Sequence, residues 1–451
     1  MSPCFAPADA PSLPIWCVTP DRLAAAPLPD SARRFVESAG FAGEAGKLLA
    51  VPAADGALAG YLFGLGPDGD AFAAGALPGL LAAGTYQLVG DVPALSPLAF
   101  GLGAYRFERY RTRPAKEVRL VPPAGADADA LARTVEAVTL VRDLVNTPAN
   151  DCGPAEIEDA ARALAARFGA DLNVVVGDAL LEENFPLIHA VGRAATRAPR
   201  LIDLTWGDPD APKVTLVGKG VAFDTGGLDI KTSAGMLLMK KDMGGAASAL
   251  GLALMIMARG LKVRLRLIIP AVENAIAGNA FRPGDVLKSR KGLSVEIGNT
   301  DAEGRLILAD ALALADAEAP DLLIDFATLT GAARVALGPQ LPPAYTDDEA
   351  LASDLARHAA SENDPLWRMP LWQPYAAMLD SKIADINNAG AGGFAGSITA
   401  ALFLKRFVGA TKSWLHLDIY AWTPSARPGR PEGGEAQTIR ALDALLAQRY
   451  G

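Results

Sequence analysis

Histidine and cysteine are scarce in this 451-residue sequence, and their spacing excludes two common kinds of site. The three cysteines form no CxxC pair and are odd in number, which argues against a disulfide framework and favours a reducing compartment. The three histidines stand far apart in the chain: His189, His358 and His416. With no HExxH motif among them, a histidine-based zinc site is not expected.

Excess positive charge and long apolar runs are also missing. The chain has 42 Lys and Arg against 51 Asp and Glu, a net charge of −9, so it lacks the basic footprint of a general nucleic-acid binder. No apolar run is long enough to span a membrane. The first basic residue is Arg22, and prolines interrupt the first twenty residues, so no secretory signal peptide is expected. These absences predict a cytoplasmic protein.

The chain is long enough for two domains with separate cores. Residues 1–122 are rich in Ala, Gly and Pro, with short strand-like runs at 60–64 and 87–89, and they predict a smaller N-terminal α/β domain. Apolar residues at spacings of three and four then predict a long amphipathic helix over 127–145, ended by the segment before Pro148. We expect this helix to link the first domain to a second, so that the domains cover 1–122 and 123–451.

Beyond the linker, apolar strands alternate with helical segments. Strands are expected at 214–217, 263–269 and 322–326, the second of them closed by Pro270, and helices at 244–258 and 306–319. Such alternation predicts an α/β domain with a largely parallel sheet, in which ligands bind beyond the carboxyl ends of the strands.

A glycine-rich stretch follows the first of these strands, over residues 218–245. It fits neither of two common phosphate-binding loop motifs. GxxxxGK[ST] fails because Lys219 is followed by Gly220, and GxGxxG fails because Phe223 stands where the third glycine belongs. A nucleotide loop is therefore not predicted.

Carboxylates near strand ends and glycine turns favour a metal site instead. The four are Asp224, Asp242, Asp301 and Glu303. Any one of these aspartates alone is more often a turn or helix cap, but together they supply the oxygen ligands that pairs of divalent cations need. Asp301, Glu303 and Arg305 alternate along the segment 299–305, so in an extended chain they would project from one side.

Two lysines accompany these carboxylates. Lys219 follows an apolar strand, where an unpaired ammonium is costly to bury, and a neutral amine beside a metal could act as a ligand. Lys231 is close enough in sequence to face the same cleft. Without this context it would be an ordinary solvated loop lysine.

Three segments together resemble the leucyl aminopeptidase (cytosol aminopeptidase, M17) family. They are Gly218–Gly227, Met239–Ala246 and Asn299–Leu306, and further similarity lies at 146–150, 278–286 and 325–332. The resemblance extends over about residues 140–420. It implies a small macro-domain-like N-terminal domain and a larger catalytic domain with a mixed, largely parallel sheet like that of zinc exopeptidases.

The resemblance implies an aminopeptidase that uses two metal ions, zinc or manganese, with magnesium or cobalt possible at the exchangeable site. Position by position, the implied ligands are Lys219, Asp224, Asp242, Asp301 and Glu303, with Asp224 and Glu303 bridging both ions. Lys231 would polarise the scissile carbonyl, and Arg305, at a helix start, would hold a bicarbonate ion as general base. The pocket for the first side chain would be lined by Met239, Thr328, Leu329 and Gly331, for which core packing is an equally good explanation.

The implied substrates are peptides with a free N-terminus, cleaved with a broad or Leu-like preference by a homohexamer. Two departures from the family pattern bear on that preference: Gly298 replaces a larger apolar residue, and residues 420–440 differ from the usual glycine-rich ending. Two other functions are open. A DNA-binding role is disfavoured by the acidic charge, and a catalytically silent scaffold is disfavoured by the complete set of costly polar groups.

Overall fold

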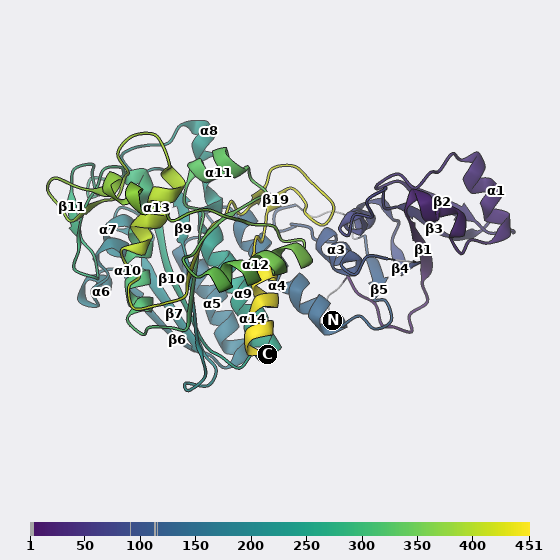
Figure 1. The fold of residues 1–451 in the computed structure, drawn as a ribbon, viewed down its shortest axis with the longest axis horizontal. Coiled ribbons are helices and arrows are strands. Elements are labelled where there is room, and N and C mark those ends of the chain that lie inside the picture. The colour runs from purple at the N-terminus through teal and green to yellow at the C-terminus, as the bar shows by residue number, and fades with distance from the viewer. Residues whose placement is uncertain (1–3, 91, 112–113, 115) are drawn as a thin grey trace. The chain divides into compact units, whose positions relative to one another are not determined.

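The computed structural model describes residues 4–90, 92–111, 114 and 116–451 and divides into two compact units. The smaller unit comprises Met1–Thr139 together with Thr423–Glu432, and the larger comprises Leu140–Trp422 together with Gly433–Gly451 (Figure 1). The short segment 423–432 thus belongs with the N-terminal unit, although it lies near the end of the chain. The domain bounds 1–122 and 123–451 stay a prediction from the sequence.

The smaller unit is built on a five-stranded sheet in the order β2-β3-β1-β4-β5. The strands are β1 (Leu13–Val18), β2 (Leu48–Pro52), β3 (Leu58–Gly64), β4 (Gly84–Val89) and β5 (Val118–Val121). All neighbours are parallel except β2 and β3. The helices are α1 (Asp30–Ser38), α2 (Leu77–Leu80) and α3 (Ser96–Gly103). The α/β class and the strand-like runs at 60–64 and 87–89 are confirmed, since these runs lie in β3 and β4.

The predicted linker helix is present as α4 (Ala128–Asn146). Its apolar positions Val135, Val138, Val141 and Val145 are buried, as the spacing of three and four predicted. The helix ends at Asn146, two residues before Pro148, because the residue before a proline avoids helical backbone angles.

The larger unit holds a mixed sheet in the order β15-β14-β17-β13-β8-β10-β7-β6, and β9 also pairs with β10. Its strands are β6 (Asp171–Val176), β7 (Arg200–Trp206), β8 (Lys213–Gly218), β9 (Gly220–Asp224), β10 (Arg264–Asn274), β13 (Leu322–Ala327), β14 (Pro343–Tyr345), β15 (Trp367–Arg368) and β17 (Trp414–Asp418). The central strands β10, β8, β13 and β17 are parallel. Strands β6 and β7 pair antiparallel with each other, β7 with β10 and β14 with β17, whereas β14 and β15 are parallel. The predicted mixed, largely parallel sheet is confirmed.

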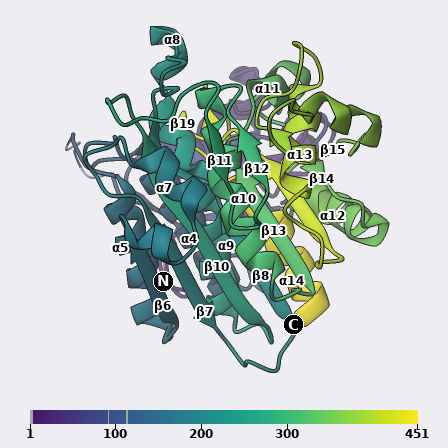
Figure 2. The ribbon, with the colours of Figure 1, turned by 90° about the vertical axis from the view of Figure 1, so that its left-hand side faces the viewer.

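Helices cover both faces of this sheet (Figure 1). Helices α7 (Pro186–Gly192) and α10 (Glu303–Asp316) pack on one face, which Figure 2 turns toward the viewer, and α5 (Pro154–Phe168) and α9 (Gly244–Arg259) pack on the other. The other helices are α6 (Ala179–Glu182), α8 (Ser233–Met236), α11 (Gly331–Leu337), α12 (Glu349–Ser361), α13 (Gly396–Lys405) and α14 (Ile439–Tyr450). Two small sheets complete the unit: β11 (Val286–Lys288), β12 (Ser294–Glu296) and β16 (Ile386–Asn387) form one, and β18 (Trp422–Thr423) and β19 (Gly433–Gly434) form the other.

The predicted bounds of two elements are wrong. Strand β10 does not stop at Pro270 but continues to Asn274. Pro270 is tolerated because the hydrogen-bond ladder is interrupted there on the side of β10 that faces β8 and β9. The pairing with β8 ends at Ile268, and the pairing with β9 begins at Ala271. Helix α10 begins at Glu303, three residues earlier than predicted, and ends at Asp316, three residues before the predicted end. Residues 300–302 form a 3₁₀ turn, so the segment 299–305 is not extended.

Candidate metal centre

The residues singled out from the sequence gather beyond the carboxyl ends of the parallel strands, where an α/β sheet presents its ligand sites. Asp224 is the last residue of β9, and Asp242 lies in the 3₁₀ helix η3 (Met239–Met243), which leads into α9. Asp301 lies in the 3₁₀ helix η4 (Thr300–Ala302), and Glu303 begins α10. Three separate segments therefore supply the four carboxylates, since η4 runs directly into α10.

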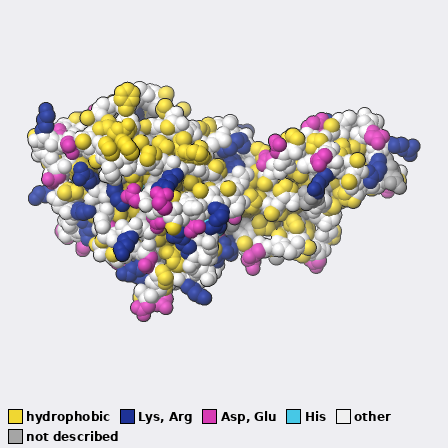
Figure 3. Space-filling view, viewed as in Figure 1, with side chains coloured by type: hydrophobic (Ala, Val, Ile, Leu, Met, Phe, Trp, Pro, Cys, Tyr) yellow, Lys and Arg dark blue, Asp and Glu magenta, His cyan; other side chains and the backbone are white. Residues whose placement is uncertain are grey.

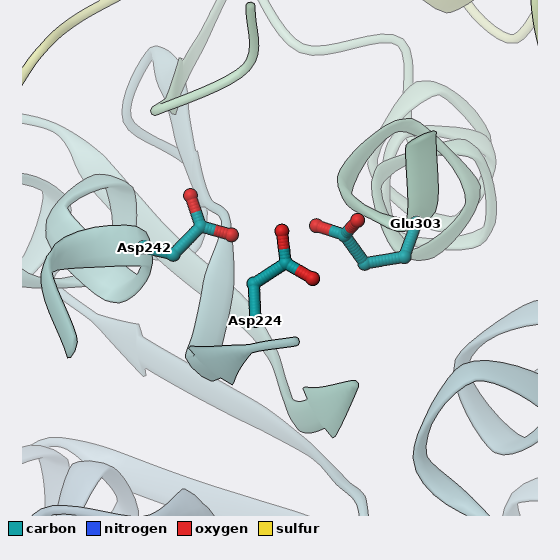
Figure 4. A group of neighbouring side chains, drawn as sticks. All are labelled: Asp224, Asp242 and Glu303. Atoms are coloured by element: carbon teal, nitrogen blue, oxygen red, sulfur yellow. The ribbon is translucent and has the colours of Figure 1, made fainter. Parts of the chain in front are cut away.

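Three of these carboxylates form a compact buried group. Asp224, Asp242 and Glu303 each offer an oxygen within 4.8 Å of the others, and all three residues are at most 3% exposed. Figure 4 shows the side chains converging from three segments of the backbone. Burying three like charges so close together is costly unless cations compensate them.

Lys219 provides part of that compensation from the chain itself. Its ammonium lies 2.7 Å from Asp242 Oδ2 and 3.2 Å from Glu303 Oε1, and it donates to the Thr328 carbonyl at 2.9 Å. Burial would lower the pKa of Lys219, but the carboxylates of Asp242, Glu303 and Asp224 outweigh it and raise the pKa. Without a metal the amine is therefore protonated, and acting as a ligand would require loss of that proton.

Lys231 lies on the solvent side of the group. Its ammonium is 2.9 Å from Asp224 Oδ2 and contacts Asp301 Oδ1. The Lys231 side chain keeps 16% of its surface exposed and that of Asp301 keeps 34%, so this edge of the site is open to an incoming molecule.

The carboxylates respond unequally to burial. Burial, aided by the neighbouring Asp242, raises the pKa of Asp224 to about 6. Burial and the Asp224 carboxylate hold the pKa of Glu303 well above its usual value. Burial acts on Asp242 too, but the ammonium groups of Lys219 and Lys241 hold its pKa below the usual value. The site is thus short of positive charge around Asp224 and Glu303.

Glycines give these side chains room. A Cβ atom on Gly304 would lie 2.4 Å from Lys219 Cε, and one on Gly245 would lie 2.2 Å from the carbonyl oxygen of Phe326. Gly226 and Gly227, just after Asp224, have φ values of +88° and +67°, which favour glycine. The glycines of the motifs therefore serve the close approach of elements around the site.

Polar residues that the sequence analysis did not single out brace the carboxylates. Asn274, at the end of β10, donates from Nδ2 to Asp224 Oδ1 at 2.9 Å and to the Thr300 carbonyl at 3.2 Å. Asp229 accepts from the Thr300 backbone N–H at 2.8 Å. Neither bracing role has a local signal, because the partners are 26 to 71 residues apart in the chain.

Arg305 lies in the first turn of α10 and is 9% exposed. Its Nη1 donates to the Asn388 carbonyl at 2.6 Å, while its Nε is buried without an acceptor. Burial lowers the pKa of Arg305 to about 10. The Asn388 side chain in turn accepts from the backbone N–H of Gly298 and Asn299, so one residue positions both the arginine and the segment before it.

A cavity of about 360 Å³ opens beside the carboxylates. It is lined by Lys219, Asp224, Lys231, Asp242, Asp301 and the four predicted pocket residues, Met239, Thr328, Leu329 and Gly331. Glu303 and Arg305 are not among the described residues that line it. Several lining residues were not predicted, and three of them carry a charge or an aromatic ring: Lys241, Arg334 and Tyr420. Two of them had a signal in the sequence: Lys241 lies in the segment Met239–Ala246, and Tyr420 begins the divergent segment 420–440.

The residues present suit hard or borderline divalent cations. Four carboxylates face the two ammonium groups of Lys219 and Lys231, and Glu303 Oε2 is buried with no hydrogen-bond donor. A buried carboxylate oxygen without a donor is unusual in a protein, and a cation would satisfy it.

Both parts of the chain match one family of known proteins. Residues 139–443 match the catalytic domain of the cytosol aminopeptidase family, and residues 13–123 match the N-terminal domain of M17 aminopeptidases. A probable cytosol aminopeptidase of Roseiflexus castenholzii is 42% identical over 360 residues, which are 76% of this chain and 73% of the relative.

Solved structures share the whole fold. The crystal structure of a cytosol aminopeptidase from Coxiella burnetii has a TM-score of 0.95 at 47% identity, covering 99% of this chain and 100% of its own. The bottromycin maturation enzyme BotP in complex with Mn has a TM-score of 0.88 at 34% identity, covering 98% of this chain and 100% of its own.

Fold, carboxylate cluster and matches together define a hydrolase, a metal-dependent aminopeptidase. The chain belongs to the cytosol aminopeptidase family, M17, and the resemblance found in the sequence motifs is confirmed. None of the helices in the described parts of the chain combines the length and the apolarity that crossing a bilayer requires.

Proposed function

We propose that this protein removes N-terminal residues from peptides by means of a water molecule activated between two divalent metal ions. One observation carries the proposal: Asp224, Asp242 and Glu303 converge within 4.8 Å of one another in a buried site. Zinc or manganese is the expected metal, with magnesium or cobalt possible at a more exchangeable position. When bound, such ions lower the pKa of a shared water and make it a nucleophile at neutral pH.

Five residues would hold the ions. Lys219, Asp224, Asp242 and Glu303 would hold the tighter one, and Asp224, Glu303 and Asp301, the last through its side chain and its backbone carbonyl, would hold the other. The chain already places the side chains of four of them within ion-pair distance of a lysine ammonium.

Lys231 would polarise the scissile carbonyl. Its ammonium stands at the open edge of the carboxylate group, next to Asp224 and Asp301, where a peptide carbonyl can reach it. A positive charge placed in advance stabilises the negative charge that develops on the carbonyl oxygen. Asp242, aided by the hydrogen bond from Thr328 at 2.7 Å, would accept the free α-amine, which internal peptide bonds lack.

Arg305 would hold the bicarbonate that serves as general base. Two observations support the assignment: its Nε is buried without an acceptor, and it lies in the first turn of α10, where free backbone N–H groups favour an anion. Asn388 would fix the guanidinium in place through its carbonyl oxygen.

Metal dependence is the direct test. Prolonged dialysis against a chelator should abolish hydrolysis of Leu-amide, and Mn²⁺ or Zn²⁺ should restore it. Circular dichroism of the metal-free protein serves as the control that the fold survives. Activity that persists when metal analysis finds no bound ion would contradict the two-metal mechanism.

The substrate range and the assembly belong to the same proposal. Peptides with a free N-terminus are the expected substrates, no nucleic acid or membrane is expected as a partner, and the site of action is expected to be the cytoplasm.

We further propose a homohexamer. Apolar side chains gather on one face of the larger unit, where Figure 1 places α11 and α13 (Figure 3). Val335 of α11 is 90% exposed and Phe394, just before α13, is 87% exposed.

A further inference from the structure

Two cations in the wall of the site cavity have no part in the chemistry proposed above. Lys241 lies in η3, directly before Asp242, and Arg334 lies in α11. Both stand over one aromatic ring: Lys241 Nζ is 4.7 Å and the Arg334 guanidinium carbon 5.6 Å from the centre of the Tyr420 ring. The cavity therefore has a positively charged wall in addition to its carboxylates.

The positive charge of this wall is only partly compensated. Arg334 Nη2 bonds to Asp418, 2.8 Å from its Oδ1, but Arg334 Nε and Nη1 are buried with no acceptor. Asp418 also accepts from Leu329 and Thr330, so its charge is shared. Among the residues that the structure describes, no carboxylate oxygen lies within 4.0 Å of Lys241 Nζ.

Buried donors without acceptors cost free energy, which an anionic ligand would recover. An arginine fork can bond a carboxylate through two parallel N–H groups, and a nearby lysine adds a point charge. A purely apolar side chain would instead leave Arg334 Nε and Nη1 without an acceptor.

The cations border the part of the cavity expected to receive the first side chain of the substrate. Thr328 bonds to Asp242, where the α-amine is expected to bind, and Leu329 and Gly331 continue from it into α11 and Arg334. Lys241 directly precedes Asp242 and lines the same cavity as Met239. A side chain leaving the α-carbon toward these residues approaches the charged wall.

We propose that this aminopeptidase prefers peptides whose N-terminal residue is acidic, glutamate or aspartate, and that Lys241 and Arg334 determine this specificity. The inference rests on the proposed function and names its substrate class. Tyr420 lines the same cavity, with both cations beside its ring. The preference differs from the broad or Leu-like one implied by the family resemblance.

The same cations could instead bind the C-terminal carboxylate of a dipeptide. We favour the side chain because the cations adjoin the predicted side-chain pocket. Substrate amides separate the two sources: Glu-amide and Gln-amide differ only in the side-chain charge and carry no C-terminal carboxylate. Leu-Gly and Leu-glycinamide differ only at the C-terminus.

The test compares kcat/KM for Glu-amide and Gln-amide with the metal-loaded protein. We expect Glu-amide to be preferred by about tenfold or more, and Lys241→Gln to reduce that ratio by about tenfold, the equivalent of one charge-assisted contact. Lys262→Gln, at an exposed position outside the cavity, is the matched control and should leave the ratio unchanged. Arg334→Gln should lower the ratio too, but it removes the ion-pair partner of the buried Asp418. If the Arg334→Gln variant fails to fold, Lys241→Gln alone carries the test.

Calorimetric binding of Glu-hydroxamate and Gln-hydroxamate provides a readout that needs no turnover. Hydrolysis of Leu-amide with equal rates for Glu-amide and Gln-amide would overturn the acidic preference and leave the proposed function standing. Discrimination only between Leu-Gly and Leu-glycinamide would assign the cations to the C-terminus and also overturn it. If no amide is hydrolysed, the proposed function fails. The acidic specificity is then supported if Glu-hydroxamate binds more tightly than Gln-hydroxamate and overturned if the two affinities are equal.

Discussion

Glu303 stands at the first position of α10 and contacts Lys219, while its second oxygen has no donor. Glu303→Gln keeps the shape of the side chain and removes its charge. We expect bound metal to fall and kcat/KM for Leu-amide to drop by at least about a hundredfold, since even residues behind metal ligands cost that much when changed. Glu182→Gln, on the exposed surface, is the control. Turnover near that of the wild type would refute the bridging role of Glu303.

The neighbouring Gly304 offers a steric test of Lys219. Gly304→Ala adds a Cβ that would lie 2.4 Å from Lys219 Cε, so the lysine must move. We expect kcat/KM to fall by roughly a hundredfold, because displacements of about 1 Å in an active site have that effect. Gly278→Ala adds a Cβ that meets nothing within 4 Å and should be neutral. Equal activity of the two variants would show that the position of Lys219 is not critical.

At the scale of single residues, the sequence indicated the carboxylates, Lys219, Lys231 and Arg305, and the structure brings them into one region. It did not indicate Asn274, Asn388 or Asp418. Their roles depend on partners from 26 to 90 residues away in the chain, so no local spacing marks them. Lys241 lies in a quoted motif, but neither it nor Arg334 was assigned a role, since only folding places the two over one tyrosine.

Helix α10 also connects elements away from the metal site. Its Asp310, fully buried, accepts from the backbone N–H groups of Leu187 at 2.8 Å and Arg290 at 2.7 Å. Burial raises the pKa of Asp310 to about 7, although these N–H groups and the Arg290 guanidinium act in the opposite direction. Because that pKa lies above the unfolded value of about 3.9, the carboxyl contributes stability that is complete below about pH 4 and is lost as the pH rises through about 7.

Asp310→Asn removes this titration and isolates its effect. We expect the free energy of unfolding of the wild type, relative to the variant, to fall by about 2 kcal/mol between about pH 5.5 and 8. Urea unfolding at several pH values measures it. A constant difference would mean that the backbone donors keep Asp310 ionised throughout this range.

Elements were predicted well where periodicity is strong and less well at their ends. The alternation of strands and helices gave the parallel centre of the sheet, and the spacing of apolar residues gave α4. The end of β10 was predicted wrongly at Pro270. Whether a proline ends a strand depends here on a gap between the neighbouring strands β8 and β9, which lie some fifty residues earlier in the chain. Strand β9 was missed because glycines at its start resemble a turn.

For the whole molecule, the proposed assembly predicts a definite mass. Light scattering after size exclusion should give six times the monomer mass. Phe394→Ser and Val335→Ser together should weaken the assembly if the apolar face of α11 and α13 is an interface, since burial of such side chains drives association. A monomer at micromolar concentration would contradict the hexamer.

Length and composition predicted an N-terminal and a C-terminal unit, but they did not predict that residues 423–432 belong to the N-terminal unit. That segment returns to the smaller unit, where Arg430 stands 4.5 Å from the centre of the Phe72 ring and a Cβ on Gly75 would meet Gly429. Only long-range packing reveals it. Its ends are joined by the pairing of β18 and β19.

This return has a consequence for how the gene can change. A single crossover near residue 139 would exchange the N-terminal unit but leave its ten-residue insert behind, facing a foreign surface. Shuffling the two units between relatives therefore requires two coordinated junctions, one in the linker helix and one around the insert. Inheritance of the two units as a pair, and chimeras that succeed only when 423–432 travels with the first unit, are the expected outcome.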